Sequence, residues 1–348
     1  MKKIFKFLIY IIIILIAAFA VFLIYATLTD YKPDEKTIVF ESENPELLSD
    51  TSQFNLLIWN IGYCGLNKEM DFFYDGGRKV RPENEKVYEN LQKVKNILTE
   101  YKSSDFILLQ EVDKNSKRSY GMNQFDSIAV IFPNKTAFYG LNYDVFFVPT
   151  PPGEPMGRVD GGLMTISKYD PSNSVRYSFP GNYEWPMSLF MLDRCFLVNR
   201  YNLSNEKELL VINTHNSAYD DGSLKAQQME YLESFLSEEF KKGNYIIVGG
   251  DWNQCPPNFK ASFKDDIMDN EVRTDISADY LNEWNWLYDN TLPTNRRVST
   301  SYKKGETLST VIDFYLLSPN IEIISVKNID LNFENSDHNP VEAVVKLK

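Results

Sequence analysis

The chain has 348 residues, 43% of them hydrophobic, and its 48 acidic and 36 basic side chains give a formal net charge of −12 at pH 7. This length allows one large domain or two ordinary ones, and the hydrophobic content is enough for a substantial core. The acidic balance argues against a protein that holds a polyanion through its own Lys and Arg, and three scattered cysteines predict neither a disulfide framework nor a zinc cluster.

The chain begins with a basic tip and a long apolar run. Lys2, Lys3 and Lys6 precede residues 7–28, which carry no charge. At about 1.5 Å per residue, a helix over this run is about 33 Å long, slightly more than the roughly 30 Å hydrocarbon core of a bilayer. A cleaved signal peptide is the alternative, but the run is longer than a typical signal-peptide core and no small-residue cleavage site follows a polar break. We therefore expect residues 1–29 to form a cytoplasmic tip and a single-pass signal anchor in the cell membrane, with the rest of the chain outside the cytoplasm.

The part after the anchor is more acidic than the whole chain. Three basic residues lie in the first six positions, so the chain after residue 29 has 33 basic and 48 acidic residues and a net charge of −15. Nucleic acid is a poor partner for this charge, although a bound divalent cation inverts the local sign. Residues 30–53 are polar and contain proline, and we interpret them as a linker to a domain over residues 54–348.

Strand-like and helix-like segments alternate through this domain. Apolar residues recur at helical spacing over 83–101 and 223–242, and Gly243 is the expected stop of the second helix. A later irregular segment of about fifty residues holds Trp284 and Trp286 in one short helix. Strand-like runs lie at 54–60, 105–111, 143–148, 161–167, 189–199, 208–214, 311–317, 321–329 and 341–347. The order predicts one α/β domain with buried sheets and outer helices.

The most informative stretch is residues 246–253, with the sequence IIVGGDWN. It predicts a buried strand that ends at an open rim, where Asp251 and Asn253 both face a bound group. The two glycines let the backbone approach that group closely. A solvated acidic turn is the alternative interpretation of the same residues.

The chain has two histidines, and both lie at the ends of predicted strands. His215 follows the run 208–214, and His338 lies in the sequence SDHNP between the last two strands. A solitary histidine is more often a surface or satisfied core residue, but neighbouring Asn and Asp at strand ends favour chemistry. Asp313 stands in an apolar run, where a buried carboxylate needs a partner such as a histidine ring. The alternative is that Asp313 is hydrated at a strand edge.

Six short motifs occur in an order that resembles the endonuclease/exonuclease/phosphatase superfamily. They are Asn60, Gln110-Glu111, Asn213-Thr214-His215, Gly250-Asp251-Trp252-Asn253, Ile312-Asp313-Phe314 and Ser336-Asp337-His338-Asn339-Pro340. Each motif alone is modest, but six in this order are specific, and the resemblance covers residues 54–348. It implies a four-layer α/β sandwich, two packed β-sheets flanked by helices, preceded in this chain by one transmembrane helix.

The resemblance also implies a metal site. Glu111 would be the main ligand of Mg²⁺ or Mn²⁺, with Asn60 and Asp337 completing or supporting the site. Oxygen ligands are what a hard divalent cation prefers. The metal would neutralise the negative charge that grows on the phosphoryl oxygens.

Catalytic roles follow from the same resemblance. Asp251 and Asn253 would position the attacking water and the phosphoryl oxygen. His338, oriented by Asp313, would be the acid/base pair. His215 would hydrogen-bond the phosphate or protonate the leaving oxygen. Which histidine is acid and which is base stays open, and Asp251 competes as the base.

The resemblance implies a metal-dependent phosphodiesterase, and the departures from the family bear on its substrate. Abasic-site enzymes carry Tyr where His215 stands, so the chain aligns with the deoxyribonuclease and sphingomyelinase side. Residues 252–257 lack the basic residues of inositol-polyphosphate phosphatases. We expect a monomer that acts on phospholipid headgroups, because the anchor holds an acidic domain near lipid. The alternatives are an extracellular nuclease on DNA or RNA and a non-catalytic surface binding protein.

Two further sets of side chains concern the substrate. The loops 183–187 and 72–74 offer apolar side chains that could touch a bilayer, and the alternative is ordinary packing. Arg158 and Arg194 are candidates for phosphate contact, and the alternative for each is a structural salt bridge.

Overall fold

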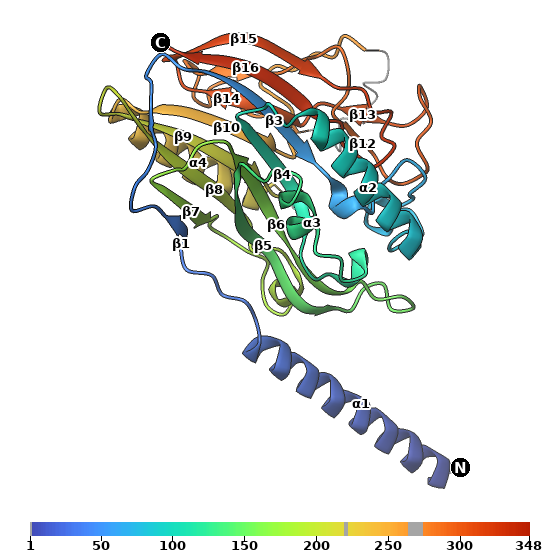
Figure 1. Ribbon diagram of the computed structural model, residues 1–348. Coiled ribbons are helices and arrows are strands. Elements are labelled where there is room, and N and C mark those ends of the chain that lie inside the picture. The colour runs from blue at the N-terminus through green and yellow to red at the C-terminus, as the bar shows by residue number, and fades with distance from the viewer. Residues whose placement is uncertain (1, 219–221, 264–273) are drawn as a thin grey trace.

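The computed structural model describes residues 2–218, 222–263 and 274–348, in which a long N-terminal helix leads into a layered domain (Figure 1). This helix, α1 (Lys2–Leu28), confirms the helix predicted over residues 7–28 and extends away from the domain. Within the described part of the chain, α1 is the one helix long and apolar enough to cross a membrane.

The domain is built around two mixed β-sheets. The first has the strand order β1-β7-β8-β9-β10-β14-β11, with β2 beside β8, and the second has the order β15-β16-β3-β4-β6-β5. The first contains β1 (Lys36–Glu41), β2 (Leu47–Leu48), β7 (Asn173–Ser178), β8 (Cys195–Leu203), β9 (Glu208–His215), β10 (Tyr245–Asp251), β11 (Asn285–Leu287) and β14 (Asp313–Leu317). The second contains β3 (Gln53–Asn60), β4 (Phe106–Asp113), β5 (Thr136–Val148), β6 (Gly157–Ser167), β15 (Ile321–Asn328) and β16 (Val341–Leu347). A separate pair joins β12 (Asn295–Arg296) to β13 (Ser309–Thr310).

Helices cover the outer faces of both sheets. The helices are α2 (Asn84–Glu100), α3 (Gln124–Ala129) and α4 (Ser223–Lys241), with short 3₁₀ turns η1 (Gly62–Cys64), η2 (Phe73–Asp75), η3 (Lys117–Ser119) and η4 (Met187–Phe190). On α2, Val87, Leu91, Val94 and Leu98 repeat at three- and four-residue spacing and pack on the second sheet. On the other side, α4 packs on the first sheet. The predicted four-layer α/β sandwich is confirmed.

Strand β3 shows why these sequences form buried sheets. Leu56 and Ile58 face the first sheet in the central core, whereas Leu57 and Trp59 face the layer of α2. Successive side chains of a strand point to opposite faces, so a strand buried on both faces must be apolar throughout. The polar residue Asn60 comes where the strand leaves the core, and this places it at the rim of the sandwich.

Three predicted segments differ from the structure. Part of the predicted linker forms β1 and β2, because β1 pairs with β7 and its Phe40 packs beside Phe138. The strand predicted over 189–199 begins only at Cys195, since the preceding apolar residues form η4 and pack outside the sheet. The short helix predicted around Trp284 and Trp286 is wrong. Trp286 lies in β11 and pairs with Leu316 of β14. Residues 264–273, which belong to the irregular segment, lie outside the described residues.

Candidate active site

Three of the predicted site residues lie in one row at the end of the first sheet. Asp251 ends β10, and its register partners are His215 on the parallel strand β9 and Asp313 on the antiparallel strand β14. Gly250 makes this row possible, because it has a φ of +149° and a Cβ there would lie 2.0 Å from the carbonyl oxygen of Thr214. The close approach that this glycine permits is to the neighbouring strand β9, and approach to a bound group stays a prediction.

The second sheet brings Asn60 and Glu111 to the same end of the sandwich. Asn60 ends β3 beside Gln110 of the parallel strand β4. The pairing of β4 with β6 is irregular between Leu109 and Val112, and Glu111 within this bulge has a φ of +54°. A bulge re-aims a side chain that would otherwise follow the strand's alternation, and Glu111 lines the pocket described below.

Asp337 and His338 come from the loop between β15 and β16. Two buried hydrogen bonds hold this loop in place. Trp59 Nε1 donates to the carbonyl oxygen of His338 at 2.9 Å, and Ser336 Oγ donates to the carbonyl oxygen of Asn60 at 2.7 Å. Both bonds join the loop to β3, so the sequence motif around His338 is held against the motif that ends in Asn60.

These elements enclose one pocket of about 460 Å³. Its lining includes Glu111, His215, Asp251, Asn253, Asp337 and His338. The remaining two predicted site residues lie directly behind this wall, where Asn60 contacts Asp251 and Asp313 contacts His338. The structure therefore brings all eight predicted site residues together, and their individual roles stay predictions.

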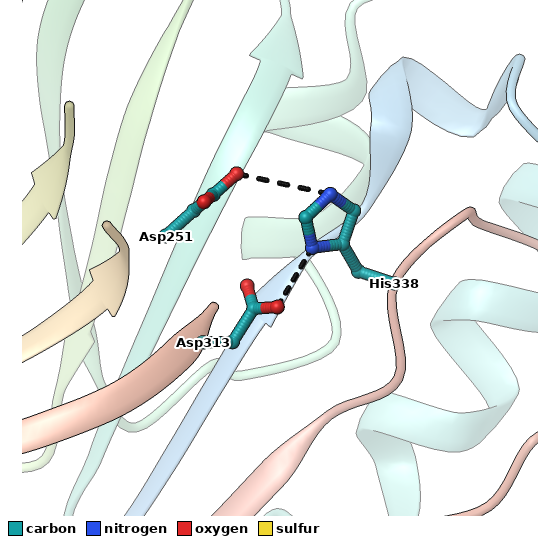
Figure 2. Close-up of side chains that lie close together, drawn as sticks. All are labelled: Asp251, Asp313 and His338. Carbon is teal, nitrogen blue, oxygen red and sulfur yellow. Dashed lines mark hydrogen bonds and ion pairs between the residues drawn. The ribbon is translucent and has the colours of Figure 1, made fainter. Parts of the chain in front are cut away.

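His338 is held between carboxylates (Figure 2). Its Nδ1 lies 2.8 Å from Asp313 Oδ2, and its Nε2 lies 3.7 Å from Asp251 Oδ2. Burial alone lowers the pKa of His338, but the negative charges of Asp313, Asp337 and Asp251 raise it well above the usual value. The imidazolium form is therefore favoured at neutral pH, with Nδ1–H donating to Asp313.

His215 lies on the other side of Asp251 and has a different environment. Its Nε2 is 3.5 Å from Asp251 Oδ2 and 4.0 Å from Glu111 Oε1, while its buried Nδ1 has no hydrogen-bond partner among the residues that the structure describes. Burial and the positive charge of Arg194 lower the pKa of His215 well below its usual value. The positive charges of His338 and Arg118 lower it further. We conclude that His215 is neutral at pH 7.

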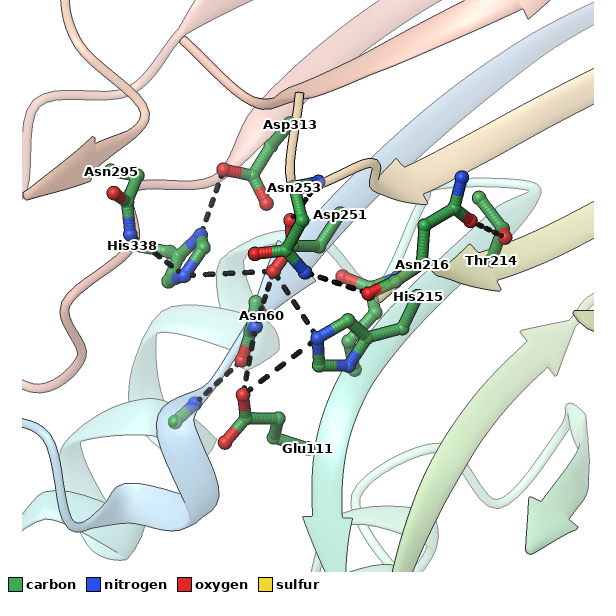
Figure 3. A network of polar contacts seen from close by, with 12 residues as sticks. Asn60, Glu111, Thr214, His215, Asn216, Asp251, Asn253, Asn295, Asp313 and His338 are labelled. Atoms are coloured by element: carbon green, nitrogen blue, oxygen red, sulfur yellow. Dashed lines mark hydrogen bonds and ion pairs between the residues drawn. The ribbon is translucent and has the colours of Figure 1, made fainter. Parts of the chain in front are cut away.

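Asn60 and Asn253 orient the carboxylates (Figure 3). Asn60 Nδ2 donates to Asp251 Oδ2 at 2.9 Å and to Glu111 Oε1 at 3.3 Å, and its Oδ1 accepts from the backbone N–H of Gly62. The backbone N–H of Asn253 donates to Asp251 Oδ1 at 2.9 Å, and its side chain donates to the carbonyl oxygen of Asn216. Asp251 is thus fixed at both oxygens by the two neighbouring amide residues.

The charges of the pocket fit a divalent cation. Burial and the negative charge of Glu111 raise the pKa of Asp337 to about 7, and burial raises the pKa of Asp251 to about 6. Raised pKa values mean that too little positive charge lies near these carboxylates to favour their ionised form. A cation bound by the carboxylate oxygens would supply that charge. Ligand atoms of Asp251, Asp313 and His338 also lie within 4.8 Å of one another. In that group, however, His338 Nδ1 is occupied by its hydrogen bond to Asp313. The carboxylates of Glu111 and Asp337 also line the pocket.

Sequence reasoning missed two contacts of this site. Asn295 Nδ2 lies 2.9 Å from His338 Nε2, although 43 residues separate them. Opposite the protonated ring, the amide would turn so that its oxygen accepts from Nε2–H. Arg118 lines the pocket, forms an ion pair with Asp113 at 2.8 Å and stacks over the ring of Tyr63 at 3.9 Å. No sequence signal marked Asn295 or Arg118, because the short elements that carry them, β12 and η3, reach the site only through the tertiary fold.

The two arginines singled out from the sequence have different surroundings. Arg158 forms ion pairs with Asp144 at 2.9 Å and Asp160 at 3.6 Å, which is the structural alternative. Arg194 lines the pocket, and its Nη1 lies 3.4 Å from the carbonyl oxygen of His215. Of the two, only Arg194 stands where a phosphate in the pocket could meet it.

Comparisons with known proteins agree with this arrangement. A sequence model of the Endonuclease/Exonuclease/phosphatase family matches residues 57–338, and no curated protein matches the sequence. The endonuclease/exonuclease/phosphatase from Beutenbergia cavernae has a similar structure, with a TM-score of 0.59 and 14% identity over 85% of this chain and 72% of that one. D. rerio TDP2 complexed with a single-strand DNA product has a TM-score of 0.52 and 14% identity over 84% and 99% of the two chains. ANGEL2, a 2',3'-cyclic phosphatase, has a TM-score of 0.53 and 16% identity over 87% and 97%. At these identities the structural likeness concerns the fold alone.

Proposed function

The chain belongs to the Endonuclease/Exonuclease/phosphatase family, and from that membership we propose that it is a divalent-metal-dependent phosphodiesterase that acts outside the cytoplasm. The family supports a phosphoester hydrolase. The observation that carries the proposal is the meeting of Glu111, Asp337, Asp251 and the His338–Asp313 pair around one pocket. We propose residues 54–348 as the catalytic domain, residues 1–29 as its anchor and residues 30–53 as the connection between them.

Glu111 and Asp337 would hold the cation, with Asn60 orienting Glu111 through its amide N–H. Mg²⁺ or Mn²⁺ suits these ligands, because hard cations prefer carboxylate oxygens and keep several waters. When bound, the cation supplies charge neutralisation at the phosphoryl oxygens. The raised pKa of Asp337, caused by burial and by Glu111, supports a cation at this place.

The remaining residues of the pocket would handle protons and orient the substrate. Asp251, whose pKa of about 6 leaves it mostly ionised at pH 7, is placed to accept a proton from an attacking water. His338, charged and held by Asp313, is placed to stabilise a phosphoryl oxygen. His215 is neutral, so it would donate or accept a hydrogen bond rather than supply charge. Asn253 fixes the Asp251 carboxylate through its backbone N–H.

For the substrate we favour a phospholipid headgroup, cleaved by a monomer at the membrane that α1 would cross. The net charge of −15 after residue 29 weakens binding to a polyanionic strand. A nuclease is the second candidate. It is favoured by the similarity in fold to TDP2, whose structure contains a single-strand DNA product.

The proposal is tested with the full chain in detergent and a panel of phosphoesters. The panel contains bis(p-nitrophenyl) phosphate, duplex and single-stranded DNA, and mixed micelles of sphingomyelin or phosphatidylcholine. We expect diester hydrolysis that stops with EDTA and returns with Mg²⁺ or Mn²⁺. Glu111→Gln should abolish the activity, whereas Tyr88→Ala, an exposed aromatic on α2, should retain it.

Two outcomes separate the candidates. Release of headgroup phosphate without nicking of DNA supports the lipid substrate, and the reverse supports the nuclease. Full activity in EDTA, or in Glu111→Gln, contradicts the metal-dependent phosphodiesterase altogether.

A further inference from the structure

One surface of the domain is aromatic and lies beside the end of α1. It is formed by the side chains of Phe146, Phe147, Trp185, Met187 and Phe190, which we call the aromatic patch. Phe146 and Phe147 come from β5, and the other three come from the loop that contains η4. Trp185 and Met187 are 61% and 55% exposed, although they are among the most hydrophobic side chains of the domain.

The aromatic patch contacts the last turns of α1 directly. The ring of Phe22 stacks on that of Phe190 at 5.9 Å and lies 5.8 Å from that of Phe146. Trp185 Nε1 lies 3.3 Å from Thr27 Oγ1, and this hydroxyl in turn donates to the carbonyl oxygen of Leu23 within α1. Ala26 is only 2% exposed. The end of α1 is therefore packed on the domain, and the position of the aromatic patch along the helix axis is fixed.

The sequence of α1 indicates how deep in a bilayer the aromatic patch would lie. A spanning helix needs about 20 apolar residues, and counting from Phe7, the first residue after the charge of Lys6, this length ends near Ala26. Phe22 then lies about 6 Å inside that end, at about 1.5 Å per residue. Side chains that touch Phe22 must lie at nearly the same depth. Aromatic residues, Trp above all, favour this boundary between headgroups and acyl chains.

We propose that the aromatic patch is inserted into the outer leaflet of the bilayer that α1 crosses, and that it holds the mouth of the active-site pocket at the level of the lipid headgroups. The proposal rests on the membrane location and the phosphoesterase activity given above, and it adds the surface that presents lipid to the site. The occupant of the patch is lipid because the patch continues the apolar surface of α1 without a break.

The same segment joins the patch to the pocket. Met191 and Leu192 follow η4 immediately and line the pocket. Tyr143 lines it as well, and its hydroxyl donates to the carbonyl oxygen of Phe190 at 2.9 Å. One wall of the pocket is therefore built from the segment that contacts α1. A phosphoester in a lipid headgroup would reach the pocket without leaving the surface of the bilayer.

The depth of the patch can be measured without any turnover. The full chain is reconstituted in phosphatidylcholine vesicles with some phosphatidylglycerol, and the fluorescence of Trp185 is taken as the difference between the wild type and Trp185→Phe. Lipids that carry a nitroxide near the top of the acyl chain should quench this difference strongly, and lipids that carry it near the methyl end should quench it less. Absence of quenching overturns the proposal. This holds as well if the cause is a dimer in which a second copy of the chain covers the aromatic patch.

A double variant tests the effect on substrate delivery. In Trp185→Ser with Met187→Ser, the ratio of turnover of vesicle lipid to turnover of bis(p-nitrophenyl) phosphate should fall by about fivefold. The matched control is Ile323→Ser with Ile324→Ser, two exposed residues on β15 at the end of the domain opposite α1 (Figure 1). An unchanged ratio in the Trp185 variant overturns the proposal. Lack of turnover of both substrates by the wild type contradicts the proposed function instead, since the quenching result is obtained independently.

Discussion

The two histidines lie on opposite sides of Asp251, and their surroundings differ in the sign of the charge (Figure 3). His338, on the loop before β16, is surrounded by carboxylates, which raise its pKa well above the usual value. His215, at the end of β9, is buried near Arg194, and both effects lower its pKa. Both rings are almost fully buried, so the difference arises from neighbouring charges rather than from exposure.

Because of this difference in charge, the two histidines can play different roles in the pocket. At pH 7 one histidine is a cation and the other is a neutral hydrogen-bonding group, although the residue type is the same. Asp251, with a pKa of about 6, is ionised between them. A site with a charged group, a neutral imidazole and a carboxylate base can bind an anionic phosphoryl group and still accept a proton from water.

The largest expected effect comes from removing each ring in turn. His338→Ala should lower kcat/KM for bis(p-nitrophenyl) phosphate by about 10³-fold or more, because a buried positive charge near the phosphoryl group is lost. His215→Ala should cost about 10²-fold, since only a neutral hydrogen bond is lost. Steady-state kinetics at pH 7 with saturating Mg²⁺ measures both, with near-ultraviolet circular dichroism to check the fold. Equal losses would mean that the two rings carry the same charge.

Asp313→Asn should produce the next largest effect. The substitution keeps the size of the side chain but removes the first of the carboxylates that raise the pKa of His338. We expect kcat/KM at pH 7 to fall by about 10²-fold and its decline at alkaline pH to begin at a lower pH, because His338 loses its proton earlier. The measurement is the pH profile of kcat/KM. Asp279→Asn, an exposed acid outside the pocket, is the control. An alkaline limb that does not move contradicts the role given to Asp313.

Much of the fold could be predicted because its strands are buried on both faces. In β3 the four residues before Asn60 are all apolar and buried, and α2 repeats its apolar residues at helical spacing. Prediction failed where side chains gain partners that lie far away in the sequence. Trp286 is in a strand because β14 pairs with β11, and Phe190 of η4 packs against Phe22 of α1.

The site was predictable as a set of residues but not as a network. A polar residue at the end of an apolar run marked Asp251 and His215, and an acid inside an apolar run marked Asp313. The contact of Asn295 with His338 has no such mark, because it depends on the pairing of β12. Asn213, part of a recognised motif, faces the interior and accepts a hydrogen bond from Gln110 of the other sheet at 2.7 Å. Its position in the motif did not reveal that it joins the two sheets.

Arg194→Met should shift the properties of His215 toward those of His338. Loss of this positive charge raises the pKa of His215, so a larger fraction of the ring is protonated as the pH falls. We expect the acid limb of kcat/KM to move to higher pH and the value at pH 7 to fall by about threefold. Arg158→Met is the matched control, because Arg158 is paired with Asp144 and Asp160 away from the pocket lining. A similar shift in both variants would indicate a general effect of net charge.

The smallest effect concerns stability, and here the two histidines should have opposite signs. His215 has a lowered pKa when folded, so the unfolded chain binds its proton more readily and folding loses about 1.4 kcal/mol for each pH unit below about 6.5. His338 has a raised pKa when folded, so its contribution to stability is complete below about 6.5 and is lost as the pH rises through the folded value. Melting temperatures of the full chain in detergent and EDTA, followed by circular dichroism, measure both.

The comparison is made with His215→Gln and His338→Gln between pH 5.5 and 7.5. Relative to the wild type, His215→Gln should gain stability as the pH falls below 6.5. His338→Gln should lose stability relative to the wild type as the pH falls from 7.5 to 6.5 and change little below 6.5, with shifts of about 2–4 °C per kcal/mol at most. Asp251 and Asp337 titrate in the same range, and their contribution cancels in His215→Gln because His215 does not shift the pKa of either carboxyl. In His338→Gln the pKa of both carboxyls rises, because the positive charge of His338 is lost, and this reduces the loss of stability expected for that variant. If His215→Gln instead loses stability relative to the wild type as the pH falls below 6.5, the imidazole of His215 is protonated in the folded protein, and the division of roles between the two histidines cannot stand.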